Sequence, residues 1–171
     1  MSDKSKKMFL IASVVVPLLL YCVYYYGMMI KNAPYRFSDF QYLRFEYGNG
    51  DSLINKYNSK TGAYQYLNNH DELKVTKLKL NKDDLLYLHR KAADLGFWNF
   101  PTVEENSSKK SPSEKTPHYL MEFVYKNKTK KVIFDAAYDG DRSLKDANER
   151  LIKEIQKKLE EAEVRSKRAA Q

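Results

Sequence analysis

The chain is poor in cysteine, histidine and glycine, and each shortage excludes a class of fold or site. Its single cysteine, Cys22, permits no internal disulfide, so cysteine usage does not identify the redox compartment. The three histidines, His70, His89 and His118, include no pair four residues apart and have no second thiol to help ligate zinc. With 6 Gly and 5 Pro in 171 residues, the composition is globular and not fibrous. We therefore expect no metal site and no disulfide framework.

Charged residues are missing from one long tract, residues 8–30. At about 1.5 Å rise per residue, a helix of this length spans roughly 34 Å, slightly more than the hydrocarbon core of a bilayer. Tyrosines, whose rings suit the headgroup boundary, crowd its far end: Tyr21, Tyr24, Tyr25 and Tyr26. The pattern predicts a transmembrane helix over residues 8–30 that binds the lipid bilayer, with residues 31–39 as a linker.

The flanking charges predict the orientation of this helix. Three lysines and one aspartate precede it, and the positive-inside rule then places residues 1–7 in the cytoplasm and the rest of the chain in the periplasm or outside the cell. A cleaved signal peptide needs small residues after the apolar tract, where this chain has Tyr and Met. A lipoprotein signal ending at Cys22 needs a small residue before it, where Tyr21 stands. A buried core helix is the third alternative, and the length of the tract disfavours it.

The remaining composition, 43% hydrophobic and 30% charged over the whole chain, is typical of one folded domain, which we place at residues 40–160. Alternation of apolar and polar residues and the intervening turns predict six strands, at residues 41–47, 52–58, 63–67, 73–80, 118–125 and 130–138. In residues 73–80 the apolar parity changes, which suggests a bulge. The expected fold is α+β, with strand and helix order ββββαββα and a mainly antiparallel sheet packed against two helices.

Two helices are predicted in this domain. The first starts after Asn81, an N-cap residue, and ends at Gly96, which suits a left-handed C-terminal cap. The second covers residues 143–165, with an apolar stripe that fades into a charged tail at residues 161–171. Between the first helix and the last two strands, residues 102–117 have no apolar period and are expected to form a surface loop.

Residues 80–125 resemble a type of uncharacterised bacterial domain that is secreted or anchored to the membrane. The resemblance consists of a capped helix, an aromatic-proline motif after it, and a following hairpin with two tyrosines. These motifs are structural, so the resemblance implies a location and brings no catalytic residues. The residues that carry it are Leu80, Asn81, Asp83, Asp84, Leu85, Phe97, Trp98, Phe100, Pro101, Tyr119 and Tyr125.

The motifs of common catalytic sites do not occur in this sequence. It has no nucleophile elbow, no phosphate-cradling glycine loop and no helical pair of carboxylates, so we predict no catalytic residue and no cofactor. Aspartates at 135, 139, 141 and 146 superficially resemble a calcium loop, but Ala137 stands at a ligand position and Asp146 where a bidentate Glu is required. A turn before a helix explains them better. An unrecognised hydrolase, with residues assembled from distant positions, remains an alternative.

Two features suggest binding. The net charge of +8 favours anionic partners if it is clustered, but lysines are interleaved with acids throughout, so we expect a solubilising surface and nucleic acid is an improbable partner. Tyr42, Tyr64 and Tyr66, on outward strand faces, are candidates for an aromatic platform that binds glycan or peptide. The leading hypothesis is a membrane-anchored binding or assembly module, an accessory subunit that contacts another membrane or envelope protein. A cell-wall or polyanion binder using Lys and Tyr is the alternative.

Overall fold

The computed structural model describes residues 3–32, 35–49, 52–68, 70–106 and 116–169, and divides the chain into two compact units, residues 1–36 and 37–171. The first unit is the single helix α1 (Asp3–Asn32). It continues through Pro17, a residue that removes one backbone hydrogen bond but that membrane-spanning helices tolerate. The predicted apolar helix is thus confirmed, and it extends beyond residues 8–30 at both ends.

The second unit contains one sheet of seven strands in the order β4-β3-β2-β1-β6-β7-β5. Every neighbouring pair is antiparallel except β5 and β7. The α+β fold and its mostly antiparallel sheet therefore agree with the sequence prediction. The strands are β1 (Phe40–Asn49), β2 (Asn55–Asn58), β3 (Ala63–Leu67), β4 (Leu73–Lys77), β5 (Val103–Glu104), β6 (Pro117–Tyr125) and β7 (Thr129–Asp135).

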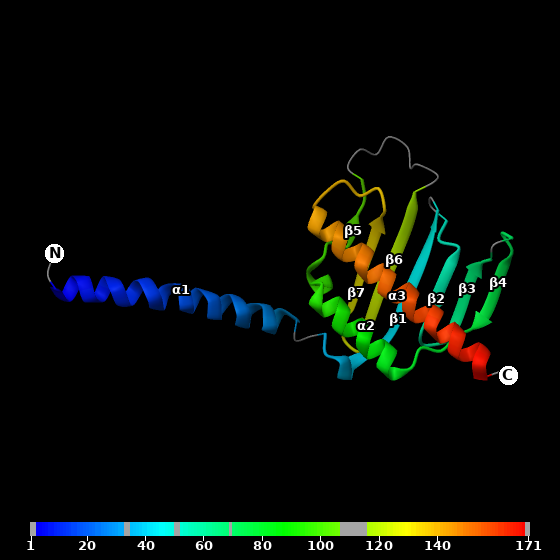
Figure 1. The fold of residues 1–171 in the computed structure, drawn as a ribbon, viewed down its shortest axis with the longest axis horizontal. Coiled ribbons are helices and arrows are strands. Elements are labelled where there is room, and N and C mark those ends of the chain that lie inside the picture. The colour runs from blue at the N-terminus through cyan, green and yellow to red at the C-terminus, as the bar shows by residue number, and fades with distance from the viewer. Residues whose placement is uncertain (1–2, 33–34, 50–51, 69, 107–115, 170–171) are drawn as a thin grey trace. The chain divides into compact units, whose positions relative to one another are not determined.

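Two helices, α2 (Lys82–Asp94) and α3 (Arg142–Ala169), lie on the same face of the sheet, and α3 crosses it diagonally (Figure 1). Side chains at alternate positions of the central strands face these helices and are buried. Tyr119, by contrast, is only half-buried. The fully buried side chains of this layer are Leu43, Phe45, Met121, Phe123, Val132 and Phe134 from the strands, with Leu88, Leu151 and Ile155 from the helices.

Local chemistry sets the limits of α2, as predicted. The side chain of Asn81 accepts a hydrogen bond from the backbone of Asp84, and the carboxylate of Asp84 accepts one from the backbone of Asn81, so both orphan donors are satisfied. Gly96 has a φ of 76°, the left-handed conformation expected at the helix end. The short 3-10 helix η2 (Phe97–Asn99) then folds Phe97 and Trp98 into the core.

The structure corrects the bounds of several predicted segments. The strands expected over residues 52–58 and 130–138 are shorter, at Asn55–Asn58 and Thr129–Asp135. The strand expected over residues 73–80 ends at Lys77, because Leu78 and Leu80 turn inward to the core in the connection to α2 and are 2% and 4% exposed. The segment expected as a loop over residues 102–117 contains the seventh strand, β5, and its last residue begins β6. Residues 107–115 of that segment lie outside the described residues.

Helix α3 continues to Ala169, through most of the segment expected as a charged tail. Ala162 is 2% exposed, so the apolar stripe extends past Leu159. Arg165 forms an ion pair with Asp84 at the start of α2. The last turns of α3 are therefore packed against the domain as well as charged.

Candidate interaction surfaces

The apolar side chains of α1 are exposed in the part of the chain that the structure describes. Residues 7–29 of this helix have a mean hydropathy of 2.2, and none of the apolar window is buried within the chain. Exposed residues include Leu10, Leu20 and Val23, at 66–70% exposure. A helix of this length and composition has the properties of a membrane anchor or a signal sequence, because exposing so much apolar surface to water costs free energy.

Positive charge gathers at one end of the sheet. Strand directions bring the turn after β2, the connection from β4 to α2 and the turn after β6 to the same end, which is also where β1 begins (Figure 1). Each of these three segments carries lysines whose side chains are exposed. We call this surface the basic end and define it by Lys60, Lys79, Lys82, Lys126 and Lys128.

Acids are few at the basic end. Asp39 forms an ion pair with Lys126 at 3.7 Å, and Asp84 is buried and paired with Arg165. Asp83 is exposed in the first turn of α2. The end of α3 lies beside the start of α2, because Arg165 pairs with Asp84. It adds the exposed Arg168, whereas Lys167 is paired with Glu163 at 2.9 Å.

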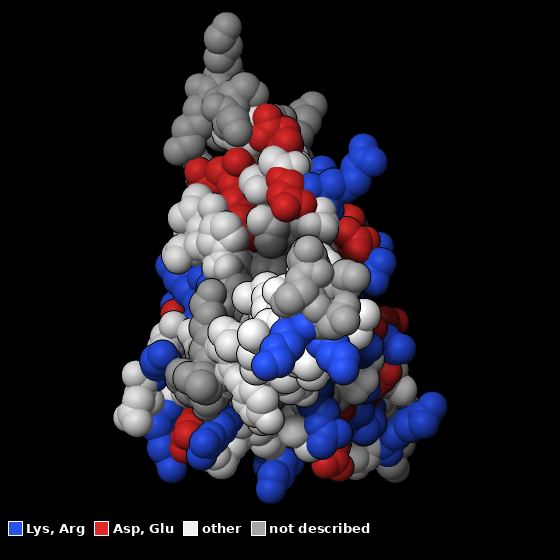
Figure 2. Space-filling view, turned by 90° about the vertical axis from the view of Figure 1, so that its left-hand side faces the viewer, with Lys and Arg blue, Asp and Glu red and all other residues white. Residues whose placement is uncertain are grey.

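The opposite end of the sheet is acidic in the described residues. Its turns carry exposed or half-exposed carboxylates from the β3–β4 turn, the segment after β5 and the β7–α3 turn: Asp71, Glu72, Glu105, Asp139 and Asp141. Figure 2 shows this polarity, with Asp and Glu dominating the upper part of the view and Lys and Arg the lower part. The fold thus gathers lysines at one end of the sheet and carboxylates, with the exposed Arg142 beside them, at the other.

The three tyrosines predicted as one aromatic platform do not share a face. Tyr64 pairs across the strands with Tyr57, which is buried under the helices, so Tyr64 and Tyr66 lie on the helix-bearing face. Tyr42 alternates with Leu43, a residue of the buried layer, and therefore points to the opposite face. The structure thus brings Tyr64 and Tyr66 together and leaves Tyr42 on the other face, because strand alternation alone does not show which face the helices cover.

A pair of tyrosines nevertheless remains on the helix-bearing face. The rings of Tyr64 and Tyr66 stack with centroids 4.8 Å apart, and both are half-buried. Burial, followed by the nearby Tyr47, raises the pKa of the Tyr64 hydroxyl well above its ordinary value. Tyr47 in turn stacks on Tyr119 at 6.1 Å, so these rings form a continuous half-buried aromatic strip along β3, β1 and β6.

Strand β4 is an edge strand, and all five of its residues are exposed. Leu73 and Val75, at 53% and 71% exposure, project from the face that carries no helix. An edge strand presents unpaired backbone donors and acceptors to a partner strand. The lysines of β4, Lys74 and Lys77, favour a partner strand that carries carboxylates.

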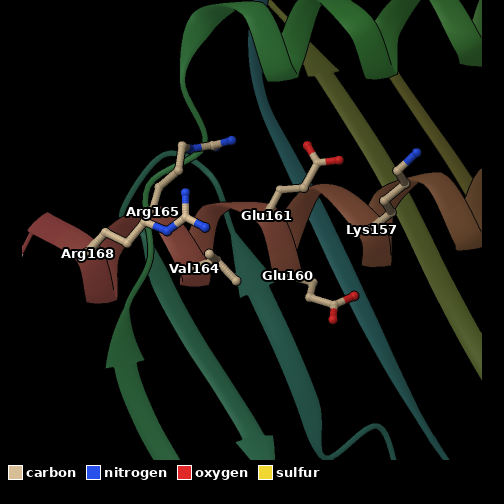
Figure 3. A pocket seen from close by; sticks show the side chains of 6 residues that line it. All are labelled: Lys157, Glu160, Glu161, Val164, Arg165 and Arg168. Atoms are coloured by element: carbon tan, nitrogen blue, oxygen red, sulfur yellow. The ribbon is translucent and has the colours of Figure 1, made fainter.

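A hollow of about 470 Å³ lies along the outer surface of α3 (Figure 3). Glu161 and Arg165 extend from the helix on the side of α2, and Glu160 and Val164 extend on the other side. Most of its lining residues, which are Lys157, Glu160, Glu161, Val164, Arg165 and Arg168, are charged. Long solvated side chains border the hollow, so its geometry does not enclose a small ligand.

Among the described residues, Glu104 is the most deeply buried acid. Glu104 on β5 is 1% exposed, and its Oε2 accepts a hydrogen bond of 2.7 Å from the amide of Asn148 on α3. Burial raises the pKa of the Glu104 carboxyl to about 7, although the Asn148 amide and the charge of Lys130 act in the opposite direction. The sequence prediction missed this pair, because the two residues lie in segments far apart along the chain.

The three histidines lie in separate parts of the domain, and the aspartate-rich turn lies between β7 and α3. Among the residues the structure describes, no group of three or more His, Cys, Asp or Glu side chains could hold a metal ion. His89 packs against Phe37 and Trp98, and His118 lies 3.9 Å from Asp135. Asp141 accepts hydrogen bonds from the backbone and hydroxyl of Ser143, so this aspartate caps the start of α3, as a plain turn would require.

Comparison with known proteins adds no relative: no family model, no curated protein and no solved structure matches this chain. Function is therefore inferred from the surfaces of the chain alone.

Proposed function

We propose that this chain is a single-pass membrane-anchored module whose α+β domain binds a partner on the outer side of the cytoplasmic membrane. The observation that carries the proposal is α1, whose apolar window has a mean hydropathy of 2.2 and is unburied among the described residues. Lipid supplies the apolar surroundings that the protein itself does not. The helix backbone is satisfied within the helix, as a hydrocarbon environment demands.

The flanking charges support the orientation. Lys4 and Lys7 precede the apolar residues, and the tyrosines near the other end suit an interface with headgroups. In this orientation the N-terminus stays in the cytoplasm and the domain is translocated. The basic character of the domain does not oppose this, because long domains translocate largely regardless of charge.

The edge strand β4 supports a role in binding or assembly. Its exposed Leu73 and Val75 offer apolar side chains, and its backbone offers a strand-pairing edge. The partner we propose is a membrane or envelope protein that adds an extended, acidic segment to this edge. Strand addition of this kind takes its affinity from main-chain hydrogen bonds and its specificity from alternate side chains.

Alkaline extraction of membranes tests the anchor. The full chain is expected to stay with the lipid at high pH, with its N-terminal residues intact. Release into the supernatant, or a mature chain that starts after the tyrosines at 21–26, would contradict the anchor and favour a signal sequence. Protease added to intact and permeabilised cells then tests the side of the membrane, since the domain of an outward-facing protein is cleaved without permeabilisation.

Co-purification after mild detergent extraction tests the binding role. A reproducible partner should be recovered with the full chain and enriched by cross-linking before lysis. Recovery of the chain alone under both conditions would count against an assembly module.

The basic end favours a second candidate function, the binding of a soluble or cell-wall polyanion. Lysines clustered on one surface attract anionic polymers through an interaction that weakens as salt rises. Retention of the detergent-solubilised protein on an anionic polymer, lost at high salt, would support this function. Retention that is insensitive to salt would contradict the electrostatic mechanism.

A further inference from the structure

The basic end is also the end at which the chain enters the domain. The 3-10 helix η1 (Phe37–Asp39) leads directly into the start of β1. Phe37 stacks on Phe40 with ring centroids 5.6 Å apart and meets His89 of α2 at 5.5 Å. These contacts hold the first residues of the domain at the same end of the sheet as the turns that carry the lysines.

The connection to α1 is short. Residues 33–36 alone separate Asn32, the last residue of α1, from Phe37. At no more than about 3.6 Å per residue, this connection reaches roughly 18 Å at full extension. If α1 spans a bilayer, the chain therefore enters the domain within that reach of the headgroups.

We propose that the basic end binds the anionic headgroups of the membrane in which α1 is anchored. Lys60, Lys79 and Lys126 come from three separate segments and are all exposed, so they form a surface and not a single charged turn. Charge complementarity identifies the ligand as lipid phosphate, and the short connection makes the bilayer its nearest source. This inference rests on the proposed membrane anchor.

The two ends of the sheet carry opposite charge, and this difference would orient the domain on an anionic membrane. The acidic end, with Asp71, Glu72 and Asp141, is repelled by an anionic surface, whereas the basic end is attracted to it. Both effects act within about a Debye length, ~8–10 Å at ordinary salt, so only the end close to the bilayer gains from them. Binding through the basic end would direct the acidic end and its turns away from the membrane.

Chemical labelling of lysines in the full-length protein tests the proposal. The protein is reconstituted into nanodiscs of zwitterionic phosphatidylcholine alone or with an anionic phosphatidylglycerol fraction, and amine acylation is followed residue by residue by mass spectrometry. In anionic discs at low salt, we expect acylation of Lys60, Lys79 and Lys126 to slow roughly fivefold or more relative to zwitterionic discs, because headgroups cover them. The effect should disappear at about 0.5 M salt, where the Debye length is only ~4 Å.

Lys74, in β4, and Lys153, on the outer surface of α3, are the internal controls, and their rates should not depend on the lipid. Equal rates in the two kinds of disc, or equal slowing of all lysines, would overturn the proposal. Inorganic phosphate is added to zwitterionic discs in a separate arm. Protection by phosphate there equal to that by anionic lipid would also overturn it, since a bilayer would not be the ligand.

A charge-neutralised variant provides a second measurement. In the triple variant Lys60→Gln, Lys79→Gln, Lys126→Gln, the remaining lysines of the basic end, Lys82 and Lys128, should lose most of their lipid-dependent protection. The matched variant, with Lys56→Gln, Lys74→Gln and Lys153→Gln, should keep it. Protection that persists equally in both variants would contradict the proposal. Retention of the protein in the discs after an alkaline wash shows separately that the anchor is intact, so failure of lipid contact is distinguishable from failure of anchoring.

Discussion

The side-chain amide of Asn148 on α3 donates a hydrogen bond of 2.7 Å to Glu104 on β5, and both side chains are sealed from solvent at 1% exposure or less. The other oxygens of the pair, Glu104 Oε1 and Asn148 Oδ1, are buried without a hydrogen-bond partner among the described residues. Both are acceptors, so the pair lacks a donor when the carboxyl is ionised. A proton on Glu104 supplies that donor, which agrees in direction with the raised pKa of this group.

The first prediction is that the domain loses stability as pH rises from 4.5 to about 7. Burial raises the pKa of Glu104 from 4.5 to about 7, so between these values the folded state binds more protons than the unfolded state. The free energy of unfolding should then fall with rising pH, by an amount on the order of 3 kcal/mol if the whole shift contributes. The stabilising effect is complete below pH 4.5 and is lost above about pH 7.

Glu104→Gln isolates this effect. The amide keeps the shape of the protonated acid and has no charge to bury, so the variant should be more stable than the natural protein at pH 8 and its stability should depend less on pH. Thermal unfolding in mild detergent measures this through the fluorescence of Trp98, the only tryptophan, which is 6% exposed. Glu160→Gln, at an exposed position of α3, is the matched control and should leave the pH profile unchanged. An unaltered profile in Glu104→Gln would exclude Glu104 as the titrating group.

The second prediction concerns Asp84, which joins the start of α2 to the end of α3. Its carboxylate accepts a hydrogen bond from the backbone of Asn81 and pairs with Arg165 and Lys158. Asp84→Ala removes one of the two capping-box hydrogen bonds, leaves Asn81 as the N-cap, and deprives Arg165 and Lys158 of their buried partner. It should lower the free energy of unfolding by about 1–3 kcal/mol. Asp83→Ala, one residue earlier and exposed, should change it by no more than about 0.5 kcal/mol. Similar losses in both variants would mean that the ion pairs add nothing beyond general helix propensity.

The predictable parts of the fold depend on residues that are close together in the sequence. The limits of α2 follow from Asn81 and Gly96, whose effects act within a few residues. The strands β6 and β7 follow from the alternation of apolar and polar residues and from the turn between them. The span of α1 follows from the absence of charge over many residues. Caps, alternation and long uncharged tracts can be recognised in a sequence without knowledge of tertiary contacts.

The parts that were missed depend on contacts between distant residues. β5 has two residues in a polar segment, and its pairing with β7 arises from the register Val103 to Ile133. The orientation of Tyr64 follows from the position of the helices above the sheet, which alternation does not specify. The basic end was missed for the same reason, because its lysines are interleaved with acids along the chain and are collected only by the strand order.

The third prediction concerns Gly48, which is buried near the end of β1. A Cβ atom at this position would overlap the backbone oxygen of Ser52, which a side-chain movement cannot relieve. Gly48→Ala should therefore destabilise the domain by about 1–3 kcal/mol through overpacking. Gly27→Ala in α1 is the control, since a Cβ there meets no atom within 4 Å. Equal melting temperatures for Gly48→Ala and the natural protein would show that the β1–β2 connection can shift to make room.

The fourth prediction tests the edge strand as the partner surface. Val75→Lys places a third lysine on β4, between Lys74 and Lys77, where it should repel an approaching strand and remove apolar contact area. Val75 is 71% exposed, so the substitution should leave the melting temperature nearly unchanged while the partner recovered after mild detergent extraction is largely lost. Val103→Lys, at a 50%-exposed valine on β5 at the other edge of the sheet, is the matched control and should retain the partner. Undiminished recovery with Val75→Lys would place the contact elsewhere, and loss in both variants would show that added charge, and not the β4 edge, is responsible.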